Sequence, residues 1–175
     1  MVLWIIGLSG VGKTTLANLV VERIRESLNN VVLLDGDVIR ALFPSDVDYT
    51  LAGRRRNAER LSNLSRFLSQ EGIHVVAAVL SIFPDLQDWN RRELAGYTEI
   101  YLKASLSTLV HRDIKNLYGP AQRGEISNVV GIDIAFPEPV QPDLIIDNEE
   151  DRSDMGEFLE RIFTLPSIQQ ALETK

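Results

Sequence analysis

The chain has 175 residues, of which 45% are hydrophobic and 25% charged, with a formal net charge of −7 and no cysteine. This composition is typical of one packed globular domain, and it excludes a scaffold held by disulfides. No apolar run approaches the roughly 18–20 residues of a membrane span, and the negative charge argues against a nucleic-acid-binding protein. We therefore expect one cytoplasmic domain over residues 1–175, without membrane or nucleic-acid partners, whose Lys and Arg residues gather locally around any anionic ligand.

Short apolar runs alternate along the chain with segments of helical periodicity. The apolar runs predict five strands, at Val2–Ile6, Val31–Leu34, His74–Leu80, Thr98–Leu102 and Leu144–Ile146. The periodic segments predict helices over Thr14–Ser27, Leu51–Gln70, Leu86–Leu94, Leu106–Ile114, Asp154–Phe163 and Ser167–Glu173. This alternation predicts an α/β three-layer sandwich, with a parallel five-stranded sheet and helices on both faces.

Residues 115–139 show no clear periodicity. Three glycines and three prolines interrupt this segment: Gly119, Gly124, Gly131, Pro120, Pro137 and Pro139. Loops of this length in compact domains are usually lids or binding loops. We therefore predict an irregular lid over about residues 115–139.

The segment Gly7–Thr14 (GLSGVGKT) matches the phosphate-binding pattern G-x-x-x-x-G-K-[ST] and lies between a predicted strand and a predicted helix. Backbone N–H groups and the positive end of the helix dipole surround a phosphate in such a loop. Lys13 can reach the β- and γ-phosphates, and the Thr14 hydroxyl can ligate Mg²⁺. The motif predicts a P-loop NTPase-type fold with ATP and Mg²⁺ as cofactors. The expected ATP-binding residues are Gly7, Ser9, Gly10, Gly12, Lys13, Thr14 and Thr15.

The motif alone does not separate kinases from GTPases, ATPases and motor domains. A GTPase should carry an N-K-x-D motif, which the sequence lacks. The predicted strand His74–Leu80 is followed by Ser81, at the position where a Walker-B motif would have an aspartate. Other carboxylates must then bind the metal ion and act as the general base, and Asp35 and Asp37 are the candidates.

Asp35 and Asp37 directly follow the second predicted strand. Ligands of parallel sheets bind beyond the carboxyl ends of the strands, which places both carboxylates near the transferred phosphate. One of them can accept or orient the proton of an acceptor hydroxyl. The alternative is that both residues only cap a turn and the following helix.

Cationic and aromatic side chains accompany this second site. Arg54 and Asn57 share one face of a predicted helix, and Arg54 can converge with Arg40 on a phosphate or sulfate. The alternative is a solvated basic start of the helix. Tyr49 can stack on a nucleobase or can belong to the core.

Taken together, these motifs resemble those of the adenylylsulfate kinase family. The resemblance runs from Ile5 to about Asn148 and includes GLSGVGKTT, DGDVIR, GRRRNAER, RDIKNLY, GEI, GID and PDLIIDN in this order. It implies a kinase that moves the γ-phosphoryl group of ATP to the 3′-hydroxyl of adenosine 5′-phosphosulfate in sulfate assimilation. The family often forms dimers, so the resemblance also implies a homodimer.

The resemblance assigns roles residue by residue. Lys13, Asp37 and the lid lysine Lys115 correspond to catalytic positions, and Arg112 to an ATP contact. The implied acceptor-binding residues are Asp35, Arg40, Tyr49, Arg54, Asn57, Leu80, Ser81, Lys115 and Ile132.

Three departures from the family pattern cluster on the acceptor side. Val38 replaces a usual asparagine, Ser81-Ile82-Phe83-Pro84 lacks the usual arginine, and Val129 stands where the family carries a second base-stacking aromatic. Stacking contributes roughly 1–3 kcal/mol per base, so this loss can change base preference. An alternative acceptor is therefore another nucleotide-linked anion, such as that of the cytidine diphosphoramidate kinase of capsule synthesis. A non-catalytic nucleotide-binding regulator would be expected to lose Lys13, Thr14 or Asp37, and all three are present.

Overall fold

The computed structural model describes residues 1–43, 48–150 and 154–173. Its strands are β1 (Val2–Ile6), β2 (Val31–Asp35), β3 (His74–Val79), β4 (Tyr97–Lys103) and β5 (Leu144–Asp147). Its helices are α1 (Lys13–Arg25), α2 (Gly36–Ala41), α3 (Leu51–Gln70), α4 (Pro84–Glu93), α5 (Leu106–Arg112), α6 (Tyr118–Gln122), α7 (Gly156–Phe163) and α8 (Pro166–Glu173).

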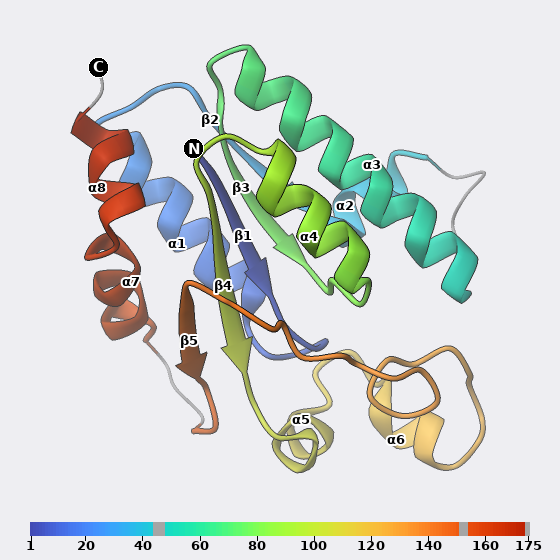
Figure 1. Ribbon diagram of the computed structural model, residues 1–175. Coiled ribbons are helices and arrows are strands. Elements are labelled where there is room, and N and C mark those ends of the chain that lie inside the picture. The colour runs from blue at the N-terminus through green and yellow to red at the C-terminus, as the bar shows by residue number, and fades with distance from the viewer. Residues whose placement is uncertain (44–47, 151–153, 174–175) are drawn as a thin grey trace.

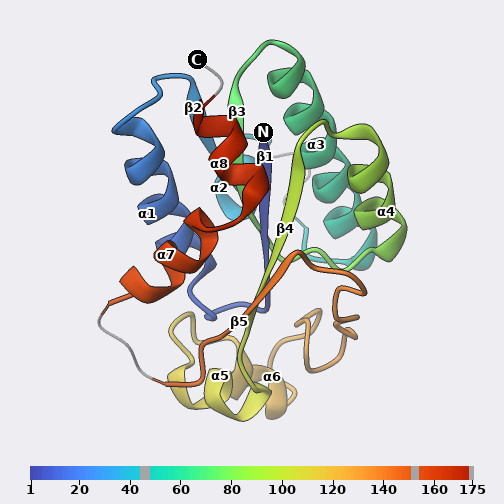
Figure 2. The same ribbon diagram turned by 60° about the vertical axis from the view of Figure 1, so that its left-hand side comes forward.

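The strands form one parallel sheet in the order β2-β3-β1-β4-β5. In Figures 1 and 2, α1, α7 and α8 cover one face of the sheet, and α3 and α4 cover the other. Both views place α5 and α6 beyond the carboxyl ends of the strands. The predicted three-layer α/β sandwich with a parallel five-stranded sheet is therefore confirmed.

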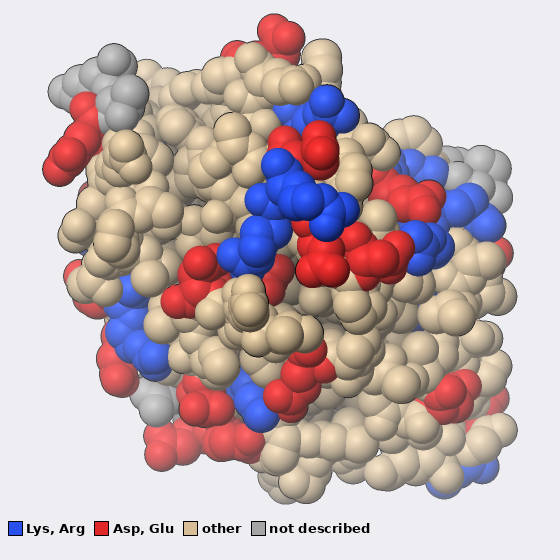
Figure 3. Space-filling model, in the orientation of Figure 1, with Lys and Arg blue, Asp and Glu red and all other residues tan. Residues whose placement is uncertain are grey.

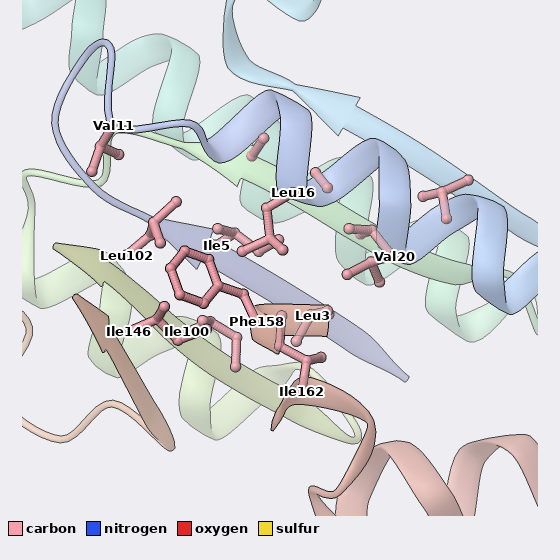
Figure 4. Close-up of a cluster of buried hydrophobic side chains, with 14 of the residues drawn as sticks. Leu3, Ile5, Val11, Leu16, Val20, Ile100, Leu102, Ile146, Phe158 and Ile162 are labelled. Atoms are coloured by element: carbon pink, nitrogen blue, oxygen red, sulfur yellow. The ribbon is translucent and has the colours of Figure 1, made fainter. Parts of the chain in front are cut away.

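The central strand β1 is buried on both faces, which explains its continuous apolar run. Leu3 and Ile5 pack with Leu16 of α1 and Phe158 of α7 in one hydrophobic cluster, drawn in Figure 4. A second cluster lies on the opposite face and contains alternate residues of the same strand, including Trp4. Because successive side chains of a strand point to opposite faces, one five-residue segment supports both layers.

Two short helices were not predicted. Helix α2 begins directly after β2, because the Asp35 side chain accepts hydrogen bonds from the backbone N–H groups of Asp37 and Val38. Helix α6 lies inside the segment 115–139, so the prediction of a wholly irregular lid was wrong. Its start is held by the Asp113 carboxylate, which accepts from three successive backbone N–H groups, those of residues 117–119. Neither helix is long enough for sequence periodicity to reveal it.

None of the described helices is both long and apolar enough to cross a bilayer. On the face shown in Figure 3, Lys and Arg residues lie in small patches interspersed with Asp and Glu.

Candidate active site

The loop between β1 and α1 has the backbone conformation of a phosphate-binding loop. Gly10 and Gly12 adopt left-handed conformations, with φ of 78° and 99°, which glycine adopts without steric cost. A Cβ on Gly7 would lie 2.3 Å from the backbone oxygen of Leu102 on β4. The loop therefore needs its glycines both for conformation and for close approach to the sheet.

Two side chains distant in sequence hold this loop in place. The Tyr118 hydroxyl donates to the Ser9 carbonyl at 2.9 Å, and Asn148 Nδ2 donates to the Val11 carbonyl at 3.0 Å. Both residues are buried, at the start of α6 and just after β5. Sequence reasoning gave neither of them a role, although both stand inside the quoted motifs RDIKNLY and PDLIIDN.

Two carboxylates lie next to the loop, and the structure gives them different contacts. Asp35 is the N-cap of α2 and also accepts a hydrogen bond from the Thr14 hydroxyl at 2.6 Å. Asp37 makes no capping contact of this kind, and its Oδ2 lies 2.5 Å from the Lys115 ammonium group. The capping alternative therefore applies to Asp35, whereas Asp37 faces a cation from the segment 115–139.

Burial and mutual charge shift the pKa values of this cluster. Burial lowers the pKa of Lys13 to about 8, and the positive charge of Lys115 adds to the effect. Burial opposes the ionisation of Asp37, but its hydrogen bond to Lys115 and the charges of Lys115, Lys13 and Arg40 outweigh burial, so its pKa is lowered. Burial likewise opposes the charge on Lys115, yet Asp37 raises its pKa above the ordinary value. The cluster is thus a carboxylate held ionised between cations.

Two arginines flank an exposed aromatic ring on the other side of the site. The guanidinium carbons of Arg40 and Arg54 lie 4.8 and 5.4 Å from the ring centroid of Tyr49, which is 51% exposed. Arg40 is buried and donates to the Asp48 carbonyl at 2.8 Å, while Arg54 donates to the Asn128 carbonyl at 2.6 Å. The two predicted anion-binding residues therefore converge, and Tyr49 belongs to the surface and not to the core.

The end of β3 contributes a strained turn. Ser81 has φ of 49°, a left-handed conformation that is uncommon for residues other than glycine. The Gln87 side chain of α4 stabilises it by donating to the Ser81 carbonyl at 3.0 Å and to its hydroxyl oxygen at 3.2 Å. Strained backbone often marks functional positions. Because Gln87 supplies the donor, the Ser81 hydroxyl can donate its own proton to a ligand.

These groups line one cavity of about 610 Å³. It contains the following predicted site residues: Ser9, Lys13, Thr14, Asp35, Asp37, Arg40, Tyr49, Arg54, Asn57, Leu80, Ser81 and Lys115. Val129, at the position of the expected second aromatic, also lines it. The volume suits a nucleotide-sized ligand, and four cations in its wall (Lys13, Arg40, Arg54 and Lys115) satisfy the expectation of locally gathered positive charge.

Six predicted site residues are not in this lining. Gly7, Gly10 and Gly12 belong to the loop described above and Thr15 to the first turn of α1, whereas Ile132 and Arg112 make contacts elsewhere. Ile132, expected at the acceptor, packs against the hydrophobic cluster on the α1 face and lines a separate depression with Leu8 and Ala104. Arg112, expected at ATP, donates to the backbone carbonyls of Asn148 and Glu150 at 2.9 and 2.6 Å. The placement of Ile132 among acceptor contacts is thus not supported in this conformation, because its side chain is used in packing.

The oxygen ligands present fit a hard divalent cation. The Thr14 hydroxyl and the Asp35 carboxylate lie side by side at the start of α1. Within the described ranges, no group of three His, Cys, Asp or Glu side chains could hold a metal ion. A hydroxyl and a carboxylate placed in this way suit Mg²⁺, which is usually held by one or two protein ligands together with substrate phosphates.

The fold and the cavity define this chain as a P-loop phosphotransferase. The family model for adenylylsulphate kinase matches residues 1–147, and the chain therefore belongs to that family.

Its relatives include proteins with two different acceptors in their names. It is 37% identical to the cytidine diphosphoramidate kinase of Campylobacter jejuni over 147 residues, covering 84% of this chain and 85% of that protein. It is also 37% identical to the adenylyl-sulfate kinase of Paraburkholderia xenovorans over 164 residues, covering 92% and 89%. Among solved structures, the Mycobacterium tuberculosis APS kinase in complex with AMPPNP and APS superposes with a TM-score of 0.82 at 29% identity, covering 93% and 95% of the two chains.

Proposed function

We propose that this protein transfers the γ-phosphoryl group of ATP to a hydroxyl of a nucleotide that carries an anionic 5′ group. The observation that supports this most is the meeting of Lys13, Asp37 and the Arg40–Arg54 pair in one cavity. The loop amides and Lys13 would hold the phosphates of ATP, and the arginines would hold the anion of the acceptor.

In the proposed reaction, the acceptor oxygen forms a bond to the γ-phosphorus while the bond from that phosphorus to the bridging oxygen breaks. ADP leaves with the bridging oxygen, and Asp37 orients the acceptor hydroxyl and takes its proton. Lys13 and Lys115 would turn toward the phosphates when ATP binds. Asp37 would then lose part of the positive charge that lowers its pKa, and it would become a better base.

Thr14 and Asp35 are the residues that would hold Mg²⁺, and the bound ion would neutralise phosphate charge. The segment 115–139 would act as a lid, because it brings Lys115 and Asn128 to the cavity from beyond the strand ends. Closure over both nucleotides would exclude water and limit ATP hydrolysis.

Two acceptors are candidates. Adenosine 5′-phosphosulfate, phosphorylated on its 3′-hydroxyl, is the acceptor implied by the sequence motifs and by the adenylyl-sulfate kinase relatives. Cytidine diphosphoramidate is the second, and Val129 in the cavity wall favours it, because an adenine would be stacked on one side only. The similarity to the Campylobacter enzyme supports the same candidate.

The test is an acceptor panel with purified protein, ATP and Mg²⁺. ADP formation should be slow until a suitable nucleotide is added, and the phosphorylated product should then appear in equal amount. Fast hydrolysis that no acceptor increases would refute the proposal and favour a nucleotide switch or motor.

A further inference from the structure

A tight turn over residues 113–117 connects α5 with α6 and contains Lys115. Two of its residues have left-handed backbone, Asp113 with φ of 22° and Asn116 with φ of 50°. Such conformations are uncommon outside glycine, and Asp and Asn tolerate them better than other residues do. The chain therefore bends sharply between the two helices, and Lys115 stands between the two left-handed residues.

Packing against the core does not hold the middle of this turn. Ile114, Lys115 and Asn116 are all exposed, Ile114 to 74%. Tyr118, by contrast, is buried, and its hydroxyl donates to the Ser9 carbonyl at 2.9 Å. The far end of the turn is therefore anchored on the phosphate-binding loop, whereas the residues around Lys115 need another support.

The carboxylate of Asp113 supplies that support. Its Oδ1 accepts from the backbone N–H groups of Leu117 and Tyr118 at 2.7 and 3.0 Å, and its Oδ2 accepts from that of Gly119 at 2.9 Å. The Asp113 carbonyl also accepts from the Asn116 N–H at 2.7 Å. One residue thus closes the turn with all three of its oxygen atoms.

This closure depends on an ionised side chain in close contact with the backbone. Hydrogen bonds from the N–H groups of Gly119 and Tyr118 lower the pKa of Asp113, so its carboxylate remains ionised near neutral pH. A charged acceptor forms stronger hydrogen bonds than a neutral one. A Cβ on Gly119 would lie 3.2 Å from Asp113 Oδ2, so the carboxylate packs directly against this glycine.

The turn brings Lys115 to the place of the proposed reaction. Lys115 Nζ lies 2.5 Å from Asp37 Oδ2, and both residues line the cavity. In the proposed reaction, the Lys115 ammonium group moves from Asp37 to the phosphates of ATP. A side chain can make this move accurately only if its backbone stays in place, because a misplacement of about 1 Å can cost about 100-fold in rate.

We propose that Asp113 is a positioning residue for phosphoryl transfer, because its carboxylate fixes the turn that presents Lys115 to the γ-phosphate. This inference rests on the proposed kinase function, and it gives a role to a residue that does not line the cavity. Asp113 would contact neither nucleotide and would act through Lys115. Loss of its carboxylate should therefore lower kcat and leave the KM for the acceptor nearly unchanged.

The test is a double-mutant cycle with the full chain, ATP and Mg²⁺, using whichever of adenosine 5′-phosphosulfate and cytidine diphosphoramidate the wild type phosphorylates faster. Lys115→Met should lower kcat about 10²- to 10³-fold, as loss of one group that stabilises transition-state charge does. Asp113→Ala should lower kcat about 10- to 100-fold by misplacing that group. The double variant should be no slower than Lys115→Met alone, whereas independent effects would multiply.

A conservative variant separates positioning from folding. Asp113→Asn keeps one oxygen that can accept from two N–H groups, so it should restore kcat to within about tenfold of the wild type. Urea unfolding shows which variants are folded. If Asp113→Ala does not fold, Asp113→Asn takes its place in the cycle, where it should slow the wild type and leave Lys115→Met unaffected.

Asp133→Ala is the matched control within the segment 115–139. The Asp133 carboxylate also accepts from two backbone N–H groups, those of Asn128 and Val129 at 2.5 Å each. The Asn128 carbonyl in turn accepts from Arg54, at the acceptor side of the cavity. Asp133→Ala should therefore raise the KM for the acceptor about 2- to 10-fold, and by the same factor in the Lys115→Met background.

The outcomes distinguish this inference from the proposed function. If the wild type phosphorylates no nucleotide acceptor, the proposed function fails and the inference fails with it. If the wild type is active but Lys115→Met keeps its kcat, Asp113 has nothing to position and only the inference is overturned. The same holds if loss of the Asp113 carboxylate changes kcat by the same factor with and without Lys115, because a general loss of structure would act equally in both backgrounds.

Discussion

Replacement of Asp37 by asparagine tests whether the carboxylate of Asp37 is catalytic or structural. Asp37→Asn keeps the size of the side chain and removes its charge. The side chains of Asp37 and Lys115 are 62% and 51% exposed, and exposed ion pairs contribute about 0.2–1 kcal/mol to stability. The free energy of unfolding should therefore fall by less than about 1 kcal/mol.

The effect on turnover should be much larger. Proton transfer by a positioned side chain typically accelerates a reaction 10²- to 10⁴-fold, which equals about 3–5 kcal/mol of activation free energy. We therefore expect kcat to fall by about 10²- to 10⁴-fold, with little change in the affinity for ATP. Steady-state kinetics with a saturating acceptor, calorimetric titration with ATP and urea unfolding measure the three quantities.

Asp35 provides the matched structural control. It caps α2, and loss of an N-cap side chain costs about 1 kcal/mol, so Asp35→Ala should destabilise the protein more than Asp37→Asn does. The contrary result is that Asp37→Asn lowers kcat less than tenfold and reduces stability as much as Asp35→Ala does. Asp37 would then be a structural residue.

Three further predictions concern the phosphate-binding loop and the stacking of the acceptor's nucleobase. Burial lowers the pKa of Lys13 to about 8, and phosphates bind the protonated amine, so the affinity for ATP should weaken as the pH rises through 8, by up to about tenfold per pH unit. Calorimetric titration with ATP at pH 7 to 9 measures this change. The control variant Lys13→Met should bind ATP weakly at every pH in this range. Gly7→Ala should cost about 1–3 kcal/mol and weaken ATP binding, since its Cβ would meet the Leu102 carbonyl at 2.3 Å. Gly72→Ala, with φ of 77° and open space, should cost about 1–2 kcal/mol but leave ATP affinity intact. Val129→Phe should improve kcat/KM for an adenine acceptor about 5- to 150-fold by restoring a stacking ring, and an unchanged ratio between adenine and cytosine acceptors would contradict the stacking argument.

The sequence determined the layers of this fold and the phosphate-binding half of its site. The central strand β1 is an uninterrupted apolar run because a parallel sheet buries both of its faces. The glycines and lysine of the loop could be read directly, since their role depends on local backbone geometry and on the helix that follows.

Only the tertiary structure decided which side chains meet across elements. It separated the capping role of Asp35 from the cation-facing position of Asp37, removed Ile132 from the cavity and placed Tyr118 and Asn148 behind the loop. It also placed Trp4, predicted to be core, and Asn90, which no motif marked, among the buried residues that border the cavity. These contacts join residues tens of positions apart, and their hydrogen bonds depend on packing angles and burial, which no spacing in the sequence records.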